Sequence, residues 1–397
     1  MALSNTPTTY GSVTRTLHWI TALLVITLIP VAVIANRLPY ETSAQLDLKG
    51  FMFSLHKTLG VAVFFVALLR IVWALSQPKP APLHPDRKTE TFLAETAHWL
   101  LYGSLVLAPL SGWVHHATTI GFAPIWWPFG QNLPLVPKSE ALEGITYGLH
   151  WVFGKVMAAT ILLHVLGALK HQFVDRDATL QRMLRHTPDI AVPPAQPHIR
   201  GPLVAAVAVW GVVLAGAGAF GLYASHGTVI ETAELADVAS DWQVQEGTIS
   251  ITANQFGGDV TGSFADWTAD ITFDPAITNG PAGSVEVVIA VGSLTLGSMT
   301  DQALAPDFFD ARTYETAVFK ADLITGIDGH EAIGTLQVRD QTVPVTMPFR
   351  LSLNGDVATV QSNLTLQRLD FGVGANMPDE STLAFDVGVA ISLTATR

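Results

Sequence analysis

Five long apolar stretches constrain the fold of this chain more than any other feature. Each is long enough to cross the hydrocarbon layer of a membrane, which takes roughly 20 residues of helix. Inside a bilayer the backbone must satisfy its own hydrogen bonds, so a chain of this kind is expected to begin as a bundle of transmembrane helices. The stretches run about Leu17–Ala35, Leu55–Leu75, His98–Val114, Leu149–Leu169 and Leu203–Tyr223.

Charge divides the 397 residues into two parts. Residues 1–223 contain 15 Lys and Arg against 10 Asp and Glu, a net charge of +5, whereas residues 224–397 contain 6 against 23, a net charge of −17. We therefore expect a second, soluble and acidic domain after the helices. Its acidity argues against nucleic-acid binding, because the phosphate backbone is itself an anion.

The chain contains no cysteine. This excludes disulfides, zinc held by cysteine, iron–sulfur clusters and covalent attachment of haem through a C-x-x-C-H motif. Any haem must therefore be held by non-covalent axial ligands.

Basic residues predict the orientation of the helices. Arg15, the Lys79–Lys88 loop and the Lys170–Arg200 segment would all lie on one side of the membrane. By the positive-inside rule this side is the cytoplasm. The protein is then expected to be multi-pass, with its N-terminus in the cytoplasm and its C-terminal domain in the periplasm.

Four histidines fall at two matched depths in these helices. His150 and His164 are 14 residues apart on one helix, which puts them on nearly one face and roughly 21 Å apart along it. Because successive helices alternate in direction, His18 lies at the inner level with His164, and His56 lies at the outer level with His150. The two axial ligands of a haem must share a level, so this pattern predicts two haems stacked through the membrane.

Other histidines compete for these roles. A histidine near a membrane surface is commonly an amphipathic anchor or a hydrogen-bonding group, but that explanation must account for four matched depths at once. Spacing alone does not eliminate His98 as an inner ligand, and it could instead hydrogen-bond a haem propionate or a quinone. The roles of His115, His116 and His171 are left open.

Cationic side chains near the histidines are candidates to pair with haem propionates, which are anions. They are Arg15, Lys57 and Arg70. Lys155 is a fourth candidate, because it falls inside a helix and an intramembrane charge normally marks a function.

The sequence around the four histidines carries a family resemblance. The motifs are T-R-T-L-H-W at His18, S-L-H-K-T-L-G at His56, and the run from G-L-H-W at His150 through L-L-H-V at His164. They resemble the bacterial di-haem cytochrome b-561 family over about Tyr10–Arg185. The resemblance implies two haem b groups held by these histidines, an inner-membrane location and electron exchange with ubiquinone or another isoprenoid quinone. Some members of that family also oxidise superoxide on the outer side.

After Tyr223 the pattern changes to short stretches rich in Val, Ile and Thr, separated by Gly, Asp and Asn. This alternation predicts an antiparallel β-barrel or sandwich, and a barrel interior can hold one small ligand. A short helix is expected at Ala303–Asp310. The predicted strands are Gly247–Ala253, Ser284–Val291, Glu331–Val338, Thr342–Leu351, Asp356–Leu364 and Thr382–Thr394.

Several motifs in this region carry a second resemblance. They include F-G-G-D-V-T-G-S-F-A-D-W from Phe256, D-F-F-D from Asp307 and R-L-D-F-G-V-G from Arg368. They resemble the YceI family, lipocalin-like periplasmic barrels that bind polyprenyl and quinone tails. Phe309, Phe319 and Phe371 are candidates to line such a cavity, although a buried aromatic residue is more often plain core. The short A-N-Q-F-G-G stretch at 253–258 departs from the family pattern, which usually has a longer, histidine-bearing segment at this place.

The sequence thus predicts a multidomain protein. An all-α transmembrane four-helix di-haem bundle (residues 10–186) is followed by a cytoplasmic segment, a fifth transmembrane helix and a linker (187–240), and then by an all-β lipocalin-like antiparallel barrel (241–397). The leading hypothesis is electron transfer between the quinone pool and a periplasmic redox partner, with a quinone or polyisoprenoid tail in the barrel. The alternatives are a periplasmic lipid carrier with a redox-sensing membrane anchor, and a cytochrome subunit of a larger dehydrogenase.

Overall fold

The computed structural model describes residues 2–119, 123–184, 200–224, 232–297, 299–327 and 329–397. It divides into two compact units. The first contains Met1–Arg37, Met52–Thr119 and Ile125–His226, and the second contains Leu38–Phe51, Ile120–Pro124 and Gly227–Arg397. The part of the predicted cytoplasmic segment at 185–199 lies outside the described residues.

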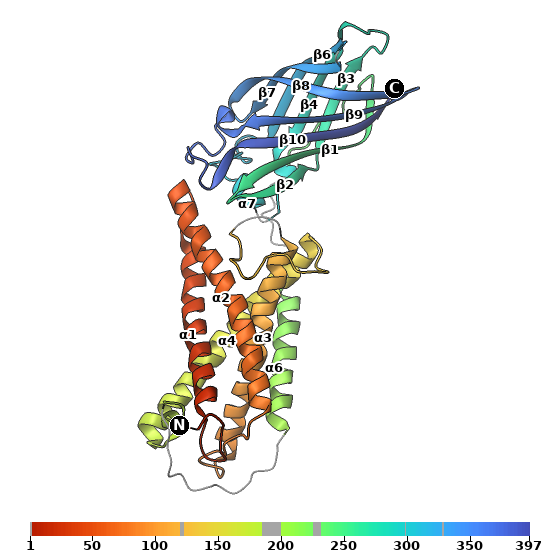
Figure 1. Cartoon of the computed structure of the whole chain (residues 1–397). Helices are drawn as coiled ribbons and strands as arrows, with labels where there is room; N and C mark the ends of the chain where they lie inside the picture. The colour runs from red at the N-terminus through yellow and green to blue at the C-terminus, as the bar shows by residue number, and fades with distance from the viewer. Residues whose placement is uncertain (1, 120–122, 185–199, 225–231, 298, 328) are drawn as a thin grey trace. The chain divides into compact units, whose positions relative to one another are not determined.

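Long helices make up the first unit (Figure 1). Each of the five predicted spans falls on one of them, although the last helix ends at Ala219, four residues before the predicted end. Helix α3 packs against α4 and α6. The helices are α1 (Ser12–Arg37), α2 (Ser43–Leu75), α3 (Lys88–Thr118), α4 (Glu140–Lys170), a π-helical turn η1 (His171–Asp175), α5 (Thr179–Leu184) and α6 (Gly201–Ala219). The start of α2, up to Phe51, belongs to the second unit.

Four helices among the described residues are long and apolar enough to cross a membrane. They are α1, α2, the continuous α4–η1 segment Ala141–Asp175, and α6. Helix α3 is not one of them, because polar residues such as His98, Ser104 and Ser111 lower its mean hydropathy. Its passage through the membrane therefore stays a prediction. Pro30 lies inside α1 without ending it, as expected of a proline in a membrane helix.

The second unit contains one curled antiparallel sheet of ten strands (Figure 1). Its order is β3-β4-β6-β7-β8-β9-β10-β1-β2-β5. The six predicted strands overlap β1, β4, β7, β8, β9 and β10, and the prediction of an all-β lipocalin-like domain is confirmed. The strands are β1 (Gln243–Gln255), β2 (Gly258–Phe264), β3 (Trp267–Phe273), β4 (Gly280–Ala290), β5 (Leu294–Thr295), β6 (Thr316–Gly326), β7 (Gly329–Val338), β8 (Gln341–Asn354), β9 (Val357–Gln367) and β10 (Leu383–Thr396).

Alternation along each strand sends one set of side chains into the curl and the other to solvent. On β6 the buried set is Ala317, Phe319, Ala321, Leu323 and Thr325. The inward residues form two apolar clusters that follow each other along the interior. The interior of the sheet is therefore the core of this unit.

The expected helix at Ala303–Asp310 is wrong in position. The structure has a single helical turn, α7 (Thr300–Ala303), and the chain then continues in turns. Pro306 explains the difference, because proline disfavours helical backbone in the residue before it and cannot donate to a helix.

Buried Arg368 anchors the segment between β9 and β10. It lies in the short 3-10 helix η3 (Arg368–Phe371) and is 3% exposed. Its guanidinium donates five hydrogen bonds to backbone carbonyls, those of Val373, Gly374, Met377, Leu383 and Ala384. One side chain thus satisfies five backbone carbonyls at this end of the sheet.

Candidate functional site

The outer histidine pair has the spacing of two ligands on one metal. The ring centres of His56 on α2 and His150 on α4 lie 6.3 Å apart, with an angle of 80° between the rings. A metal–nitrogen bond of about 2 Å, and a nitrogen about 1 Å from its ring centre, place two rings that face each other across one iron roughly 6 Å apart. The pair therefore fits a haem iron between the two imidazoles.

Backbone carbonyls fix the orientation of both rings. His56 Nδ1 lies 3.1 Å from the carbonyl oxygen of Leu28, and His150 Nδ1 lies 2.8 Å from that of Ala108. Since a carbonyl only accepts, each Nδ1 carries the proton and donates, which leaves Nε2 with a lone pair for a metal. Gly112 on α3 makes room for His150, because a Cβ there would lie 2.8 Å from its Nδ1 and Cε1.

The inner pair has the same spacing. The ring centres of His18 on α1 and His164 on α4 lie 6.3 Å apart, with 57° between the rings. His98 on α3 is closer to His164, at 5.2 Å. That distance is about 1 Å too short for two imidazoles on opposite sides of one iron. The geometry therefore favours His18 over His98 as the partner of His164.

Arg70 lies directly beside the inner pair. Its Nη2 donates to His18 Nδ1 over 3.2 Å, and its guanidinium lies 5.8 Å from the ring centre of Tyr102. A guanidinium can only donate, so His18 Nδ1 accepts here and its proton lies on Nε2. Ligation of iron through Nε2 would require Arg70 to turn away from His18, and a propionate carboxylate is a suitable new partner.

Open space lies next to the histidines on their own helices. A Cβ added at Gly60, Gly154 or Gly167 would meet nothing within 4 Å. Gly60 and Gly154 each follow an outer histidine by four residues, one helical turn, and Gly167 follows His164 by three. A flat macrocycle needs this kind of clearance beside its axial ligands, so the residues present fit haem.

An apolar layer separates the two histidine levels. Val25 and Leu28 on α1, Val63 and Ala67 on α2, and Leu105 on α3 are buried in one cluster. Met157 and Ile161 of α4, between His150 and His164 in the chain, pack against it.

The other cationic candidates differ in burial. Arg15 and Lys57 are 8% and 7% exposed, so both charges lie inside the helical unit. Lys155 is exposed, and its Nζ lies 5.2 Å from the ring centre of Trp151. It follows His150 by five residues, about 140° around the helix, so it lies on a different face of α4. Its role toward haem stays a prediction.

A network of ion pairs connects the start of α3 with the end of α4. Glu90, His171 and Asp175 are close enough together to hold a metal ion. However, Arg87 and Lys170 already bind both carboxylates, which indicates a structural ion-pair network. No other group of this kind occurs among the described residues.

Asp177 joins this network to His84 and His171, through contacts of 3.0 and 2.7 Å. Burial alone would raise the pKa of its carboxyl group. Hydrogen bonds from Thr179 and His171 outweigh that effect and hold the pKa below its usual value of 3.8.

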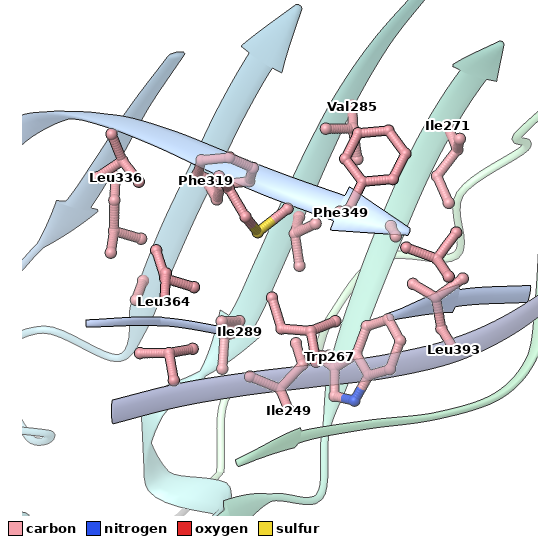
Figure 2. A pocket seen from close by; sticks show the side chains of 18 of the residues that line it. Ile249, Trp267, Ile271, Val285, Ile289, Phe319, Leu336, Phe349, Leu364 and Leu393 are labelled. Atoms are coloured by element: carbon pink, nitrogen blue, oxygen red, sulfur yellow. The ribbon is translucent and has the colours of Figure 1, made fainter. Parts of the chain in front are cut away.

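The curled sheet encloses an apolar cavity of about 200 Å³. Figure 2 shows side chains from several strands pointing into it. Phe309 and Phe319 line the cavity, whereas Phe371 is packed in the core cluster and does not line it, which corrects that prediction. The other aromatic lining residues were not predicted from the sequence, although the apolar residues at every second position of β3, from Trp267 to Phe273, were an available signal. These aromatic residues are Trp242, Phe264, Trp267, Phe273 and Phe349.

Comparison with family models assigns both parts of the chain. Residues 9–186 match the model described as prokaryotic cytochrome b561, and residues 242–395 match the YceI-like domain. The chain joins a cytochrome b561 domain to a YceI-like domain. Both resemblances found in the sequence are thereby confirmed. This family implies haem b and, with four apolar helices, a membrane protein.

Curated relatives match the cytochrome b561 part. Cytochrome b561 homolog 2 of Escherichia coli is 28% identical over 189 residues, which cover 46% of this chain and 95% of the relative. A probable superoxide oxidase, CybB of Yersinia pestis, is 25% identical over 42% of this chain and 91% of its own length.

Solved structures match the YceI-like part. BcnA of Burkholderia cenocepacia is 30% identical, with a TM-score of 0.37, and the match covers 39% of this chain and all of that one. The YCEI protein of Campylobacter jejuni is 18% identical, with a TM-score of 0.31, over 43% of this chain and 94% of its own.

Proposed function

We propose that the cytochrome b561 domain is a di-haem electron carrier that connects the quinone pool with a redox partner on the outer side of the membrane. The observation that carries this proposal is the pair of equal histidine spacings, 6.3 Å at each of two levels. His18 and His164 would hold the inner haem b, and His56 and His150 the outer one. Bound haem would supply one-electron redox chemistry.

Protein groups would orient the ligands of the two haems and pair with the negative charge of the haem propionates. Leu28 and Ala108 carbonyls orient the outer ligands, while Arg70 and buried Arg15 and Lys57 offer cations for propionates. His98 is proposed to hydrogen-bond a propionate or a quinone. Ubiquinone or another isoprenoid quinone is the proposed acceptor or donor.

The basic residues Arg15, Lys79, Arg87 and Lys88 support an orientation with these loops in the cytoplasm. We therefore place the protein in the bacterial inner membrane with the YceI-like domain in the periplasm. The outer haem would then be the one nearer to periplasmic electron donors.

Superoxide is one proposed donor, because the Yersinia pestis relative is named as a probable superoxide oxidase. Two superoxide anions would each lose one electron and become O₂. One quinone would take up the two electrons together with two protons and become a quinol.

A count of haem per chain tests this proposal directly. Purified protein assayed as the pyridine haemochrome should contain two haem b, and His56→Ala and His164→Ala should each retain about one. The control His330→Ala changes a histidine in the YceI-like domain and should retain two. One or no haem in the wild-type protein, after expression with ample haem, would contradict the proposal.

The apolar cavity supports a second role, the binding of a quinone or polyisoprenoid tail by the YceI-like domain. The match of residues 242–395 to the YceI-like domain implies an isoprenoid-type ligand, and the lining residues of this cavity offer only aliphatic and aromatic surface. The competing function is a lipid carrier whose membrane part is a redox-sensing anchor. In cells, His56→Ala should abolish activity as fully as deletion of residues 241–397. Full activity in His56→Ala would favour the carrier.

A further inference from the structure

Two inward-facing polar residues sit at the end of neighbouring strands in the YceI-like domain. Thr325 is the last buried residue of β6. His330 is the first inward-facing residue of β7, and Ala332 and Leu336 face inward after it. They are direct partners in the strand register. Thr325 Oγ1 and His330 Nδ1 are 3.1 Å apart, and Thr325 is 7% exposed. A hydrogen-bonded polar pair thus faces inward from these strands.

This pair adjoins the apolar cavity. The His330 ring stacks on Phe349, with ring centres 5.3 Å apart and 21° between the planes, and meets Phe273 edge-on at 6.4 Å. Both phenylalanines line the cavity. Figure 2 shows Phe349 toward the same end as Ile271 and Leu393, with Leu336 toward the other. His330 therefore lies at the Phe349 end of the cavity.

The opposite end is closed by apolar packing. Ala317, at the start of β6, is buried in one cluster with Leu304, Ala311 and Phe371 from the segments around α7 and η3. An unpaired polar group would be costly there, whereas at the Thr325–His330 end it could be hydrogen-bonded. A chain-shaped ligand would accordingly place its polar head beside His330 and its tail toward Ala317.

Charge limits what that head can be. No charged side chain lines the cavity among the described residues. Lys320 on β6 faces outward and pairs with Glu286 over 2.9 Å. Residues 224–397 carry a net charge of −17. A phosphate would find no fixed cation to pair with and would be repelled by the domain, so the site favours an uncharged head.

We propose that Thr325 and His330 bind the uncharged oxygen head, a carbonyl or hydroxyl group, of an isoprenoid lipid whose tail fills the cavity. The inference rests on the proposed lipid-binding function of this domain and names its ligand class. The threonine hydroxyl can donate to Nδ1 or accept from it. In the first case His330 Nε2–H donates to a carbonyl, and in the second Nε2 accepts from a hydroxyl. The same pair can therefore bind a quinone and its quinol.

Competition binding to the full-length protein in detergent tests this proposal. The probes share one geranylgeranyl chain and differ in the head: an alcohol, a monophosphate and an oxygen-free hydrocarbon. Native mass spectrometry of the intact protein with an equal mixture measures the occupancy of each. We expect the alcohol to exceed the hydrocarbon by about tenfold, the value of one hydrogen bond in a dry site, and to exceed the phosphate as well.

His330→Phe and Thr325→Val should both remove the preference for the alcohol while the hydrocarbon still binds. Thr335→Val, on the outward face of β7, is the matched control and should keep it. Ala317→Trp fills the cavity and should abolish occupancy by all three probes, which shows that the signal comes from this domain.

The outcomes separate this inference from the function on which it rests. If no probe binds the wild-type protein, the lipid-binding function itself fails. If the alcohol and hydrocarbon bind equally, or the preference survives both His330→Phe and Thr325→Val, the assignment of the pair is overturned while lipid binding stands. If the monophosphate probe has the highest occupancy, the assignment of an uncharged head is overturned. If His330→Phe no longer binds the hydrocarbon either, the cavity itself is disturbed in that variant. The alcohol preference of the nearly isosteric Thr325→Val then decides whether the pair binds the head.

Discussion

Gly112 offers a sharp test of the outer haem site, because its substitution should displace one ligand without touching the other three. In Gly112→Ala the new Cβ would lie 2.8 Å from His150 Nδ1 and Cε1. Ordinary contact between such atoms starts near 3.5 Å, so the ring must move by about 0.7 Å. A shift of that size would lengthen the 2.8 Å hydrogen bond from His150 to the Ala108 carbonyl to about the limit for a hydrogen bond.

Loss of such a supporting hydrogen bond typically weakens metal binding about 10- to 100-fold. The assay is transfer of haem from the purified protein to an excess of apomyoglobin, followed by absorbance. The wild-type protein should release its two haems slowly, and Gly112→Ala should release one of them about 10 to 100 times more readily. Gly211→Ala on α6, where a Cβ meets nothing within 4 Å, is the control and should behave as wild type. Unchanged transfer from Gly112→Ala would refute the assignment of His150, and faster transfer of both haems would refute the independence of the two levels.

Two further predictions concern stability. Arg368→Met leaves five backbone carbonyls without their donor, three of them in buried hydrogen bonds, and should destabilise the YceI-like domain by about 3–5 kcal/mol. Calorimetry should show this loss, whereas exposed Arg350→Met should have little effect. Equal unfolding transitions in Arg368→Met and the wild-type protein would show that these hydrogen bonds are dispensable. Asp177 has a folded-state pKa below its usual 3.8, so its contribution is complete above that value and is lost as the pH falls. Asp177→Asn should therefore lower the Tm of the helical domain at pH 7 by about 2–4 °C, as expected for about 1 kcal/mol, and the gap to wild type should shrink toward pH 3; a gap independent of pH would contradict this.

The helical part could be predicted from the sequence because its signals are long and strong. A run of about 20 apolar residues leaves few alternatives to a membrane helix, and helix geometry converts the 14-residue interval between His150 and His164 into two levels. The sequence could not choose between His18 and His98 at the inner level. That choice depends on how far apart the helix axes lie, which the ring-centre distances of 6.3 and 5.2 Å now provide.

The β part was predictable in class but not in detail. Strand β6 was missed, although Thr316–Gly326 alternates, because Lys320 and Asp322 on its outward face weaken the hydrophobic signal. The Thr325–His330 pair was missed for a different reason. It is created by the register between β6 and β7, and a threonine and a histidine five residues apart across a turn carry no signal of their own.

The apolar layer between the two histidine levels has an electrical consequence. None of the residues in this cluster has a titratable side chain, so an electron that passes through it between the levels would move without a proton, over roughly 21 Å of a hydrocarbon core about 30 Å thick. Such a step would cross about two thirds of the membrane voltage. At 100 mV, inside negative, an inward electron would then work against about 1.5 kcal/mol, the corresponding share of the 2.3 kcal/mol for a full crossing. In the proposed orientation, the energised state of the cell would slow the delivery of electrons to the inner haem, and its collapse would speed it.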